Sequence, residues 1–156
     1  MNEQAMMLME RVRQQLDQAA AVFAAAHDMD LAKPCSDEED EPTSTVAAAA
    51  AHLAGGYHRL GRFLYSARYV AAVPTADPHL DHRGTPGPAA IADVLTQLGS
   101  VREPVALLGE LTDEQLHSVP AKANRFADGR RTLRQVIDEM TAHQAAHLAA
   151  VKQALA

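Results

Sequence analysis

The chain has 156 residues, 47% of them hydrophobic, which is the size and apolar share of one domain with a core of its own. Aromatic residues make up only 4%, and alanine and leucine dominate the apolar set, which favours closely packed helices over a sheet. The net charge of -6 comes without a basic stripe, which argues against a nucleic-acid partner, and no apolar run reaches the roughly 18 residues of a membrane span.

Cysteine usage and the N-terminus indicate where the protein works. Cys35 is the single cysteine, which excludes an internal disulfide framework and suits a reducing compartment. The chain starts Met1-Asn2-Glu3-Gln4, without a basic start and an apolar run behind it. We therefore expect a soluble all-α domain, residues 1–156, in the cytoplasm.

The N-terminal forty residues predict a helix and then an acidic connector. The helix covers about residues 2–26, where apolar residues recur at steps of three and four: Leu8, Met9, Val12, Leu16, Ala19, Ala20 and Phe23. Residues 33–42 are acidic and flanked by prolines, but they lack the alternating ligands and the turn glycine of a calcium loop. We interpret them as a solvated connector.

A second helix is predicted from a cap at Thr43-Ser44-Thr45 to about Tyr69. Its apolar stripe is made of Val46, Leu53, Leu60 and Leu64. At about 100° per residue, His52 lies on the flank of this stripe and His58 points well away from it. The pair Gly55-Gly56 costs helix stability on the order of 1 kcal/mol per glycine, which indicates that another helix approaches closely beside His52.

Residues 71–88 hold four prolines and two glycines and predict a long loop. Roughly 18 residues at up to about 3.4 Å each can span a bundle, so the second and third helices can run parallel, joined by a crossover. His79, Asp81 and His82 could form a second metal site or a lid there. Ordering ligands on such a segment costs much conformational entropy, and we place no site on it.

The third helix is predicted at about residues 89–110, with a kink caused by Pro104 after Gly99-Ser100. Its inward positions are Ile91, Val94, Leu95, Leu98, Val105 and Leu108. Thr112 and Gln115 form the pattern of a capping box for a short turn. The last helix opens at Thr132, and its apolar face consists of Leu133, Ile137, Met140, Leu148, Val151 and Leu155.

His143 and His147 lie one turn apart on the core side of this last helix and are our candidate metal ligands. Histidines at i and i+4 can converge on one ion, and a buried ring nitrogen without a partner costs on the order of 1 to 3 kcal/mol, which a metal removes. In an antiparallel pair of helices, His52 faces a point near residue 146, so we assign it as the third ligand. Glu139, one turn before His143, could orient a ligand, accept a proton or ligate directly.

The stretch leading to His52-Leu53-Ala54, the turn at residues 111–116, and Thr132-Leu133 leading to the histidine pair together resemble the DinB/YfiT-like superfamily of four-helix bundles. The resemblance covers nearly the whole chain. It implies a four-helix bundle with a long crossover between helices two and three, frequent homodimers, and a zinc or nickel site held by His52, His143 and His147. Relatives include thiol-dependent transferases, whereas the isomerase-like members use a glutamate ligand that this histidine set lacks.

Two functions remain open. The first is a metal-dependent transferase or hydrolase that activates a low-molecular-weight thiol or water against an electrophilic substrate. The second is a non-catalytic stress-response or metal-binding module whose ion mainly fixes the bundle. A cavity that reaches solvent beside the ion favours the enzyme, and a closed site of four protein ligands favours the module. A di-iron bundle is disfavoured, because the paired Glu-x-x-His motifs are missing.

Overall fold

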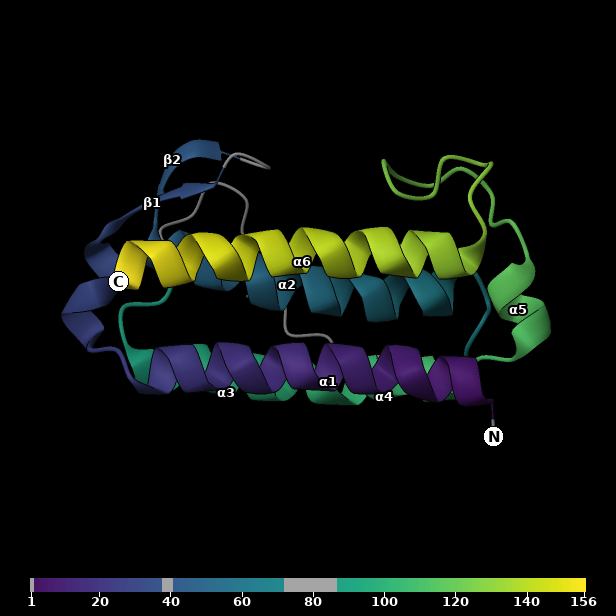
Figure 1. Cartoon of the computed structure of the whole chain (residues 1–156), viewed down its shortest axis with the longest axis horizontal. Coiled ribbons are helices and arrows are strands. Elements are labelled where there is room, and N and C mark those ends of the chain that lie inside the picture. The colour runs from purple at the N-terminus through teal and green to yellow at the C-terminus, as the bar shows by residue number, and fades with distance from the viewer. Residues whose placement is uncertain (1, 38–40, 72–86) are drawn as a thin grey trace.

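The computed structural model describes residues 2–37, 41–71 and 87–156. Four helices of seven or more residues within these ranges pack together: α1 (Glu3–Ala24), α2 (Val46–Ser66), α3 (Ile91–Ser100) and α6 (Leu133–Leu155) (Figure 1). The shorter elements are η1 (Asp28–Ala32), β1 (Pro34–Asp37), β2 (Glu41–Thr45), α4 (Arg102–Ala106), η2 (Leu107–Glu110) and α5 (Asp113–His117). No helix in the described ranges is long and apolar enough to cross a membrane.

The helices α2 and α3 run in the same direction, while α1 and α6 run the opposite way (Figure 1). Both α2 and α3 begin beside η1, because the Val46 N–H donates to the Lys33 carbonyl at 3.0 Å and the Ile91 N–H to Asp28 Oδ1 at 2.8 Å. This confirms the predicted parallel pair, which a long linker joins. Most of that linker, residues 72–86, lies outside the described residues. This includes His79, Asp81 and His82, the residues weighed as a second metal site.

The helix starts follow the capping signals in the sequence. The side chains of Asn2, Thr45, Thr112 and Thr132 each accept a hydrogen bond from a backbone N–H of the first turn that follows. Thr112 and Thr132 form complete capping boxes with the glutamines three residues later. Local hydrogen bonds of this kind depend on a few neighbouring residues, which is why the pattern predicts them.

The predicted third helix is divided into α3, α4 and η2. Pro104 has no N–H to donate to the Ser100 carbonyl, and the α-helix is interrupted at Val101. The predicted position of the kink is confirmed, although the structure has a helix in three pieces rather than one bent helix.

A small hairpin replaces part of the expected connector. The strands β1 and β2 pair antiparallel, with Pro34 opposite Thr45 and Cys35 opposite Ser44. Cys35 is buried, and β1 packs against α6. The protein is thus mostly α rather than purely α. Lys33, Pro34 and Ser36 are exposed, as expected of a solvated connector, whereas residues 38–40 of the acidic run lie outside the described residues. The pairing joins residues about ten positions apart through backbone hydrogen bonds, which side-chain periodicity does not report.

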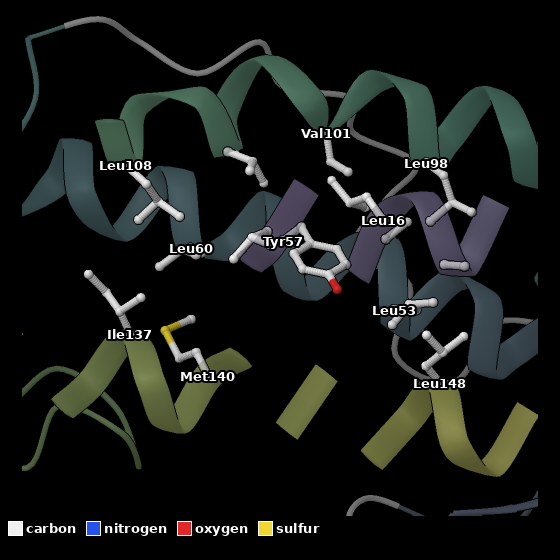
Figure 2. Packing of buried hydrophobic residues seen from close by; sticks show 14 of the residues in the cluster. Leu16, Leu53, Tyr57, Leu60, Leu98, Val101, Leu108, Ile137, Met140 and Leu148 are labelled. Atoms are coloured by element: carbon white, nitrogen blue, oxygen red, sulfur yellow. The ribbon is translucent and has the colours of Figure 1, made fainter. Parts of the chain in front are cut away.

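The core lies along the axis between the four long helices (Figure 2). Figure 2 shows Leu16 of α1, Leu98 of α3, and Ile137 and Leu148 of α6 around the central ring of Tyr57. The middle of helix α2 is enclosed on every side, since the six consecutive residues 53–58 are all buried. His58, predicted to point away from the leucine stripe of α2, is nevertheless buried, because directions away from that stripe also meet protein.

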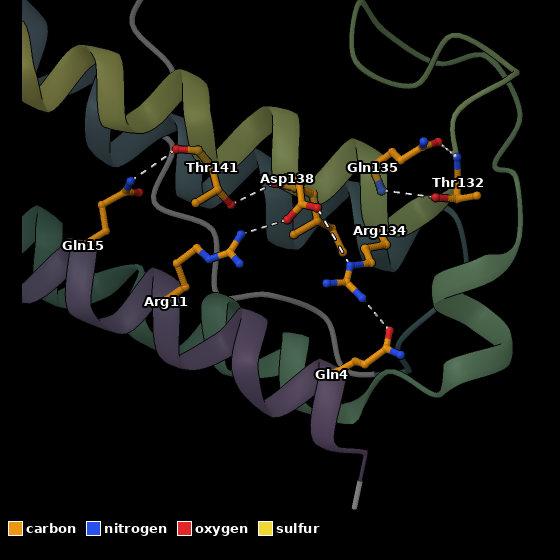
Figure 3. A network of polar contacts seen from close by, with 9 residues as sticks. Gln4, Arg11, Gln15, Thr132, Arg134, Gln135, Asp138 and Thr141 are labelled. Carbon is orange, nitrogen blue, oxygen red and sulfur yellow. Dashed lines mark hydrogen bonds and ion pairs between the residues drawn. The ribbon is translucent and has the colours of Figure 1, made fainter.

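Polar contacts tie α1 to α6 outside this core (Figure 3). Arg11 donates to Asp138 at 2.9 Å, and Arg134 donates to Gln4 at 2.9 Å. Both are partly exposed, so each contributes little free energy on its own. Together they link the N-terminal halves of α1 and α6.

Candidate functional site

The three histidines predicted as ligands come together between α2 and α6. The Nε2 atoms of His143 and His147 are 2.9 Å apart, and their ring centres are 4.3 Å apart. The ring of His52 lies nearly parallel to that of His147, with an interplanar angle of 13° and a centre separation of 6.2 Å. The rings therefore lie at one depth of the bundle, as the helix lengths predict.

Burial differs among the three rings. His147 is fully buried, whereas His52 and His143 are half-buried. Because the pair is on one helix face, it reaches from the surface at His143 to the interior at His147. Any group bound at these nitrogens would meet solvent on the His143 side.

The donor set suits zinc or nickel by its chemistry, since both accept imidazole nitrogen. In a tetrahedral zinc site with Zn–N distances of about 2.0–2.1 Å, two ligand nitrogens lie about 3.3 Å apart. The 2.9 Å between the two Nε2 atoms is close to that separation. In the described part of the chain, however, no three His, Cys, Asp or Glu side chains are grouped as ligands of one ion. The rings would have to turn about their side-chain bonds to share one, so the three-histidine site stays a prediction.

A loop residue that the sequence analysis did not consider contacts the histidine pair. Arg125, in the loop between α5 and α6, places Nη2 at 2.8 Å from Nδ1 and 3.1 Å from Nε2 of His143. A guanidinium can only donate hydrogen bonds, so the His143 nitrogen that bonds to it acts as an acceptor. While a neutral His143 accepts from Arg125 at Nδ1, its Nε2 carries the ring proton and has no lone pair to offer an ion.

The loop that carries Arg125 is held by its own polar groups. The Asn124 side chain accepts from the N–H groups of Phe126 and Ala127 at 2.9 Å. Asp128 accepts from the N–H groups of Arg131 and Arg130, also at 2.9 Å, and these bonds hold the pKa of its carboxyl below the usual range. These bonds order the loop as it returns toward the start of α6 (Figure 1).

A surface pocket of about 290 Å³ lies between this loop and α6. Its walls are Arg125, Phe126, Arg131, Glu139, Ala142 and His143. Glu139 is exposed and lines this pocket, so the prediction that it shares the flank of His143 is confirmed. The structure gives it no hydrogen bond or ion pair in the described part of the chain, and its role toward a ligand stays a prediction.

The close approach predicted at the glycine pair occurs at Gly56. A methyl group built on Gly56 would lie 2.3 Å from Oε1 of Gln144, so no other residue fits there without displacing that side chain. The Gln144 amide, itself buried, donates to the Leu53 carbonyl across the interface of α2 and α6. The partner is thus a glutamine side chain rather than a second backbone. Gln144 fixes α6 beside the residue that follows His52.

A second polar contact crosses the core next to this one. Tyr57 donates its hydroxyl to Gln15 of α1, and Gln15 in turn donates to the Thr141 carbonyl of α6 at 3.2 Å. Burial raises the pKa of the Tyr57 hydroxyl well above its usual value. Helices α1, α2 and α6 are therefore joined through Gln15 and the uncharged hydroxyl group of Tyr57.

Tyr57 should make the protein sensitive to alkali. Its pKa is about 10 in the unfolded chain and higher in the folded one, so its contribution to the free energy of unfolding is complete below pH 10 and is lost as the pH rises toward the folded value. Urea unfolding between about pH 8 and pH 11 measures this loss. Tyr57→Phe should flatten the alkaline decline, whereas Tyr65→Phe, at an exposed ring, should keep it. An unchanged decline in Tyr57→Phe would contradict the assignment.

Sequence reasoning missed Arg125, Phe126, Arg131 and Gln144. Gln144 had a signal, because it lies three residues before His147 and residues three apart share a helix face. The loop residues had none, since their positions depend on turns made by Asn124 and Asp128. Comparison with protein-family models, with curated proteins and with solved structures gave no match.

Proposed function

We propose that this chain is a divalent-metal-binding protein of the DinB/YfiT-like type, acting as a metal-dependent transferase or hydrolase with a low-molecular-weight thiol or water. Zinc or nickel would be held by His52, His143 and His147. The homodimer and the cytoplasmic location implied above belong to the same proposal.

The observation that carries the proposal is the convergence of three histidines from two helices about ninety residues apart in sequence. His52 reaches the pair on α6 only because α2 and α6 run antiparallel at a fixed register. The parallel α2 and α3, with a long linker between them, support the DinB-like assignment in the same way. Fold alone does not imply function, so the assignment depends on the site.

The chain's own groups would supply binding and proton transfer. A bound divalent ion lowers the pKa of a thiol or water, which makes the anion available as a nucleophile. His143 lines the surface pocket, so a substrate would approach on that side. Glu139, one turn before His143 on α6 and lining the same pocket, could accept the proton that the thiol or water loses. Cys35 is buried beneath α6, so the thiol would be a separate small molecule.

The pocket also separates the enzyme from the non-catalytic module. A structural metal site is closed by four protein ligands, whereas a catalytic site keeps a position open. Here a solvent-reaching pocket adjoins one of three histidines. This favours the enzyme, and the stress-response or metal-binding module is the alternative.

Metal titration tests the first half of the proposal. Metal-free protein titrated with zinc or nickel ions in a calorimeter is expected to bind about one ion per chain, as three imidazoles between two helices form one site. Absence of binding by both ions would contradict it.

Catalysis is tested on the zinc and nickel forms, and on manganese and iron forms, with a panel of small thiols and electrophiles. Thiol-dependent consumption of an electrophile that requires the ion supports the enzyme. A tightly held ion with no turnover against the whole panel supports the module.

A further inference from the structure

A second surface pocket, at the C-terminal end of α2, has the dimensions of a ligand site. Its volume of about 560 Å³ lies within the roughly 300–1,000 Å³ that ligand pockets occupy. Helix α5 lies at the same end of the bundle (Figure 1). The end of α2 is about 14 residues beyond His52, roughly 20 Å along the helix, so this pocket is separate from the histidine site. Its walls are Tyr65, Ser66, Arg68, Tyr69, Val70 and Ala71.

Arg68 occupies a backbone position that favours glycine. Its φ is 62°, in the left-handed region that residues with a side chain rarely adopt. The Arg68 N–H donates to the Tyr65 carbonyl, and the Tyr69 N–H donates to the Leu64 carbonyl, both at 2.9 Å. These two bonds form the Schellman motif, which ends helices and usually has glycine where Arg68 stands. The backbone gains nothing from an arginine here, which indicates a role for its side chain.

The positive charge of Arg68 is not balanced by a neighbouring acidic group. In the described part of the chain its side chain has no hydrogen bond or ion pair, and none of the six wall residues is acidic. The carbonyls of Phe63, Leu64 and Tyr65 each accept a backbone N–H. These bonds reduce the partial negative charge that a free helix end presents to an anion. The pocket therefore carries one positive charge, which matches a singly charged acid.

Two tyrosine rings form the flat surfaces of the pocket. Tyr69 is held in place, since its hydroxyl lies 3.2 Å from the Ser118 hydroxyl and Gln115 of α5 donates to its carbonyl at 3.1 Å. Tyr65 is 41% exposed, which leaves its ring accessible to a ligand. Aromatic rings pack on one another, and a guanidinium donates two parallel hydrogen bonds to a carboxylate. The lining therefore suits a molecule that joins an aromatic ring to a carboxylate.

We propose that this pocket binds a small aromatic carboxylate, whose carboxylate pairs with Arg68 and whose ring packs against Tyr65 and Tyr69. A phosphate dianion is disfavoured, because one guanidinium balances only one negative charge and a phosphate has no ring to pack on the tyrosines. The site goes beyond the proposed function, since it requires neither a metal ion nor the histidines.

Ligand-observed NMR on the metal-free protein compares benzoate with two analogues. Benzamide, which keeps the shape without the charge, is expected to bind about 10-fold more weakly, and cyclohexanecarboxylate, which keeps the charge without the aromatic ring, about fivefold more weakly. Inorganic phosphate should compete only weakly with benzoate. No binding of benzoate, equal binding of either analogue, or tighter binding of phosphate would overturn the proposal.

Substitution of Arg68 locates the site. Arg68→Gly removes the guanidinium and supplies the residue that this backbone position favours, so it should weaken benzoate by at least about 10-fold while the urea midpoint stays unchanged or rises. Arg68→Lys, which keeps the charge without the planar fork, should weaken benzoate by about threefold. Arg62→Gln, at an exposed position of α2 outside the pocket walls, should change the affinity by less than about twofold. Equal benzoate affinity in Arg68→Gly and Arg62→Gln would overturn the site. Because no metal is present, the result is independent of the metal titration.

Discussion

His147→Ala is expected to lower the affinity for zinc or nickel by at least about 100-fold. Even the loss of a group that only orients a ligand typically costs 10- to 100-fold, and His147 would be a ligand itself. It is also the one fully buried ring of the three, so its removal leaves a cavity and should lower the free energy of unfolding by about 2 kcal/mol. Competition with a chelating dye measures the affinity, and urea unfolding measures the stability.

Two further variants separate metal binding from folding. His143→Ala changes a half-buried ring, so it should lose the ion with a smaller loss of stability. His117→Ala, on the exposed side of α5, should alter neither quantity beyond about 0.5 kcal/mol. Wild-type metal affinity in a folded His147→Ala protein would remove the three-histidine site from the proposed function.

The parts of the fold that the sequence predicts are those controlled locally. The caps at Thr45 and Thr132 need only the residues of one turn. The depth of His52 opposite His147 follows from the uniform rise of a helix, once the two helices are antiparallel. Such features can be derived without knowing what surrounds each helix.

The predictions are wrong or incomplete where the position of a residue depends on neighbours that are distant in the sequence. His58 is buried because α2 is enclosed on every side over residues 53–58, which a single leucine stripe does not reveal. The hairpin depends on pairing between β1 and β2, whereas the acidic run between 33 and 42 indicated only solvation. Arg125 reaches His143 through loop turns that have no periodicity. The sequence therefore predicts the positions of the three histidines on their helices. It does not predict the loop residues that lie beside His143.

At Gly56, the space available for a side chain determines whether a substitution stabilises or destabilises the protein. Gly99 is the matched control, because it also lies in a helix but a methyl group built on it meets nothing within 4 Å. Gly99→Ala should stabilise the protein by about 0.5–1 kcal/mol, the usual gain in helix propensity. Gly56→Ala should fail to stabilise, since the methyl group displaces Gln144 and breaks its buried hydrogen bond to Leu53, a loss of about 1–3 kcal/mol.

A larger side chain at Gly56 should force the helices apart. Gly56→Leu adds overpacking to the lost hydrogen bond and should lower the free energy of unfolding by about 3 kcal/mol, measured by urea unfolding. When the Gln144 side chain is removed by Gln144→Ala, Gly56→Ala should become neutral or stabilising. The two substitutions should therefore show a coupling free energy of about 1–2 kcal/mol. Gly56→Ala that stabilises as much as Gly99→Ala would show that Gln144 does not need this space. Because Gln144 contacts the residue next to His52, Gly56→Leu should also weaken metal binding, although it changes none of the three histidines.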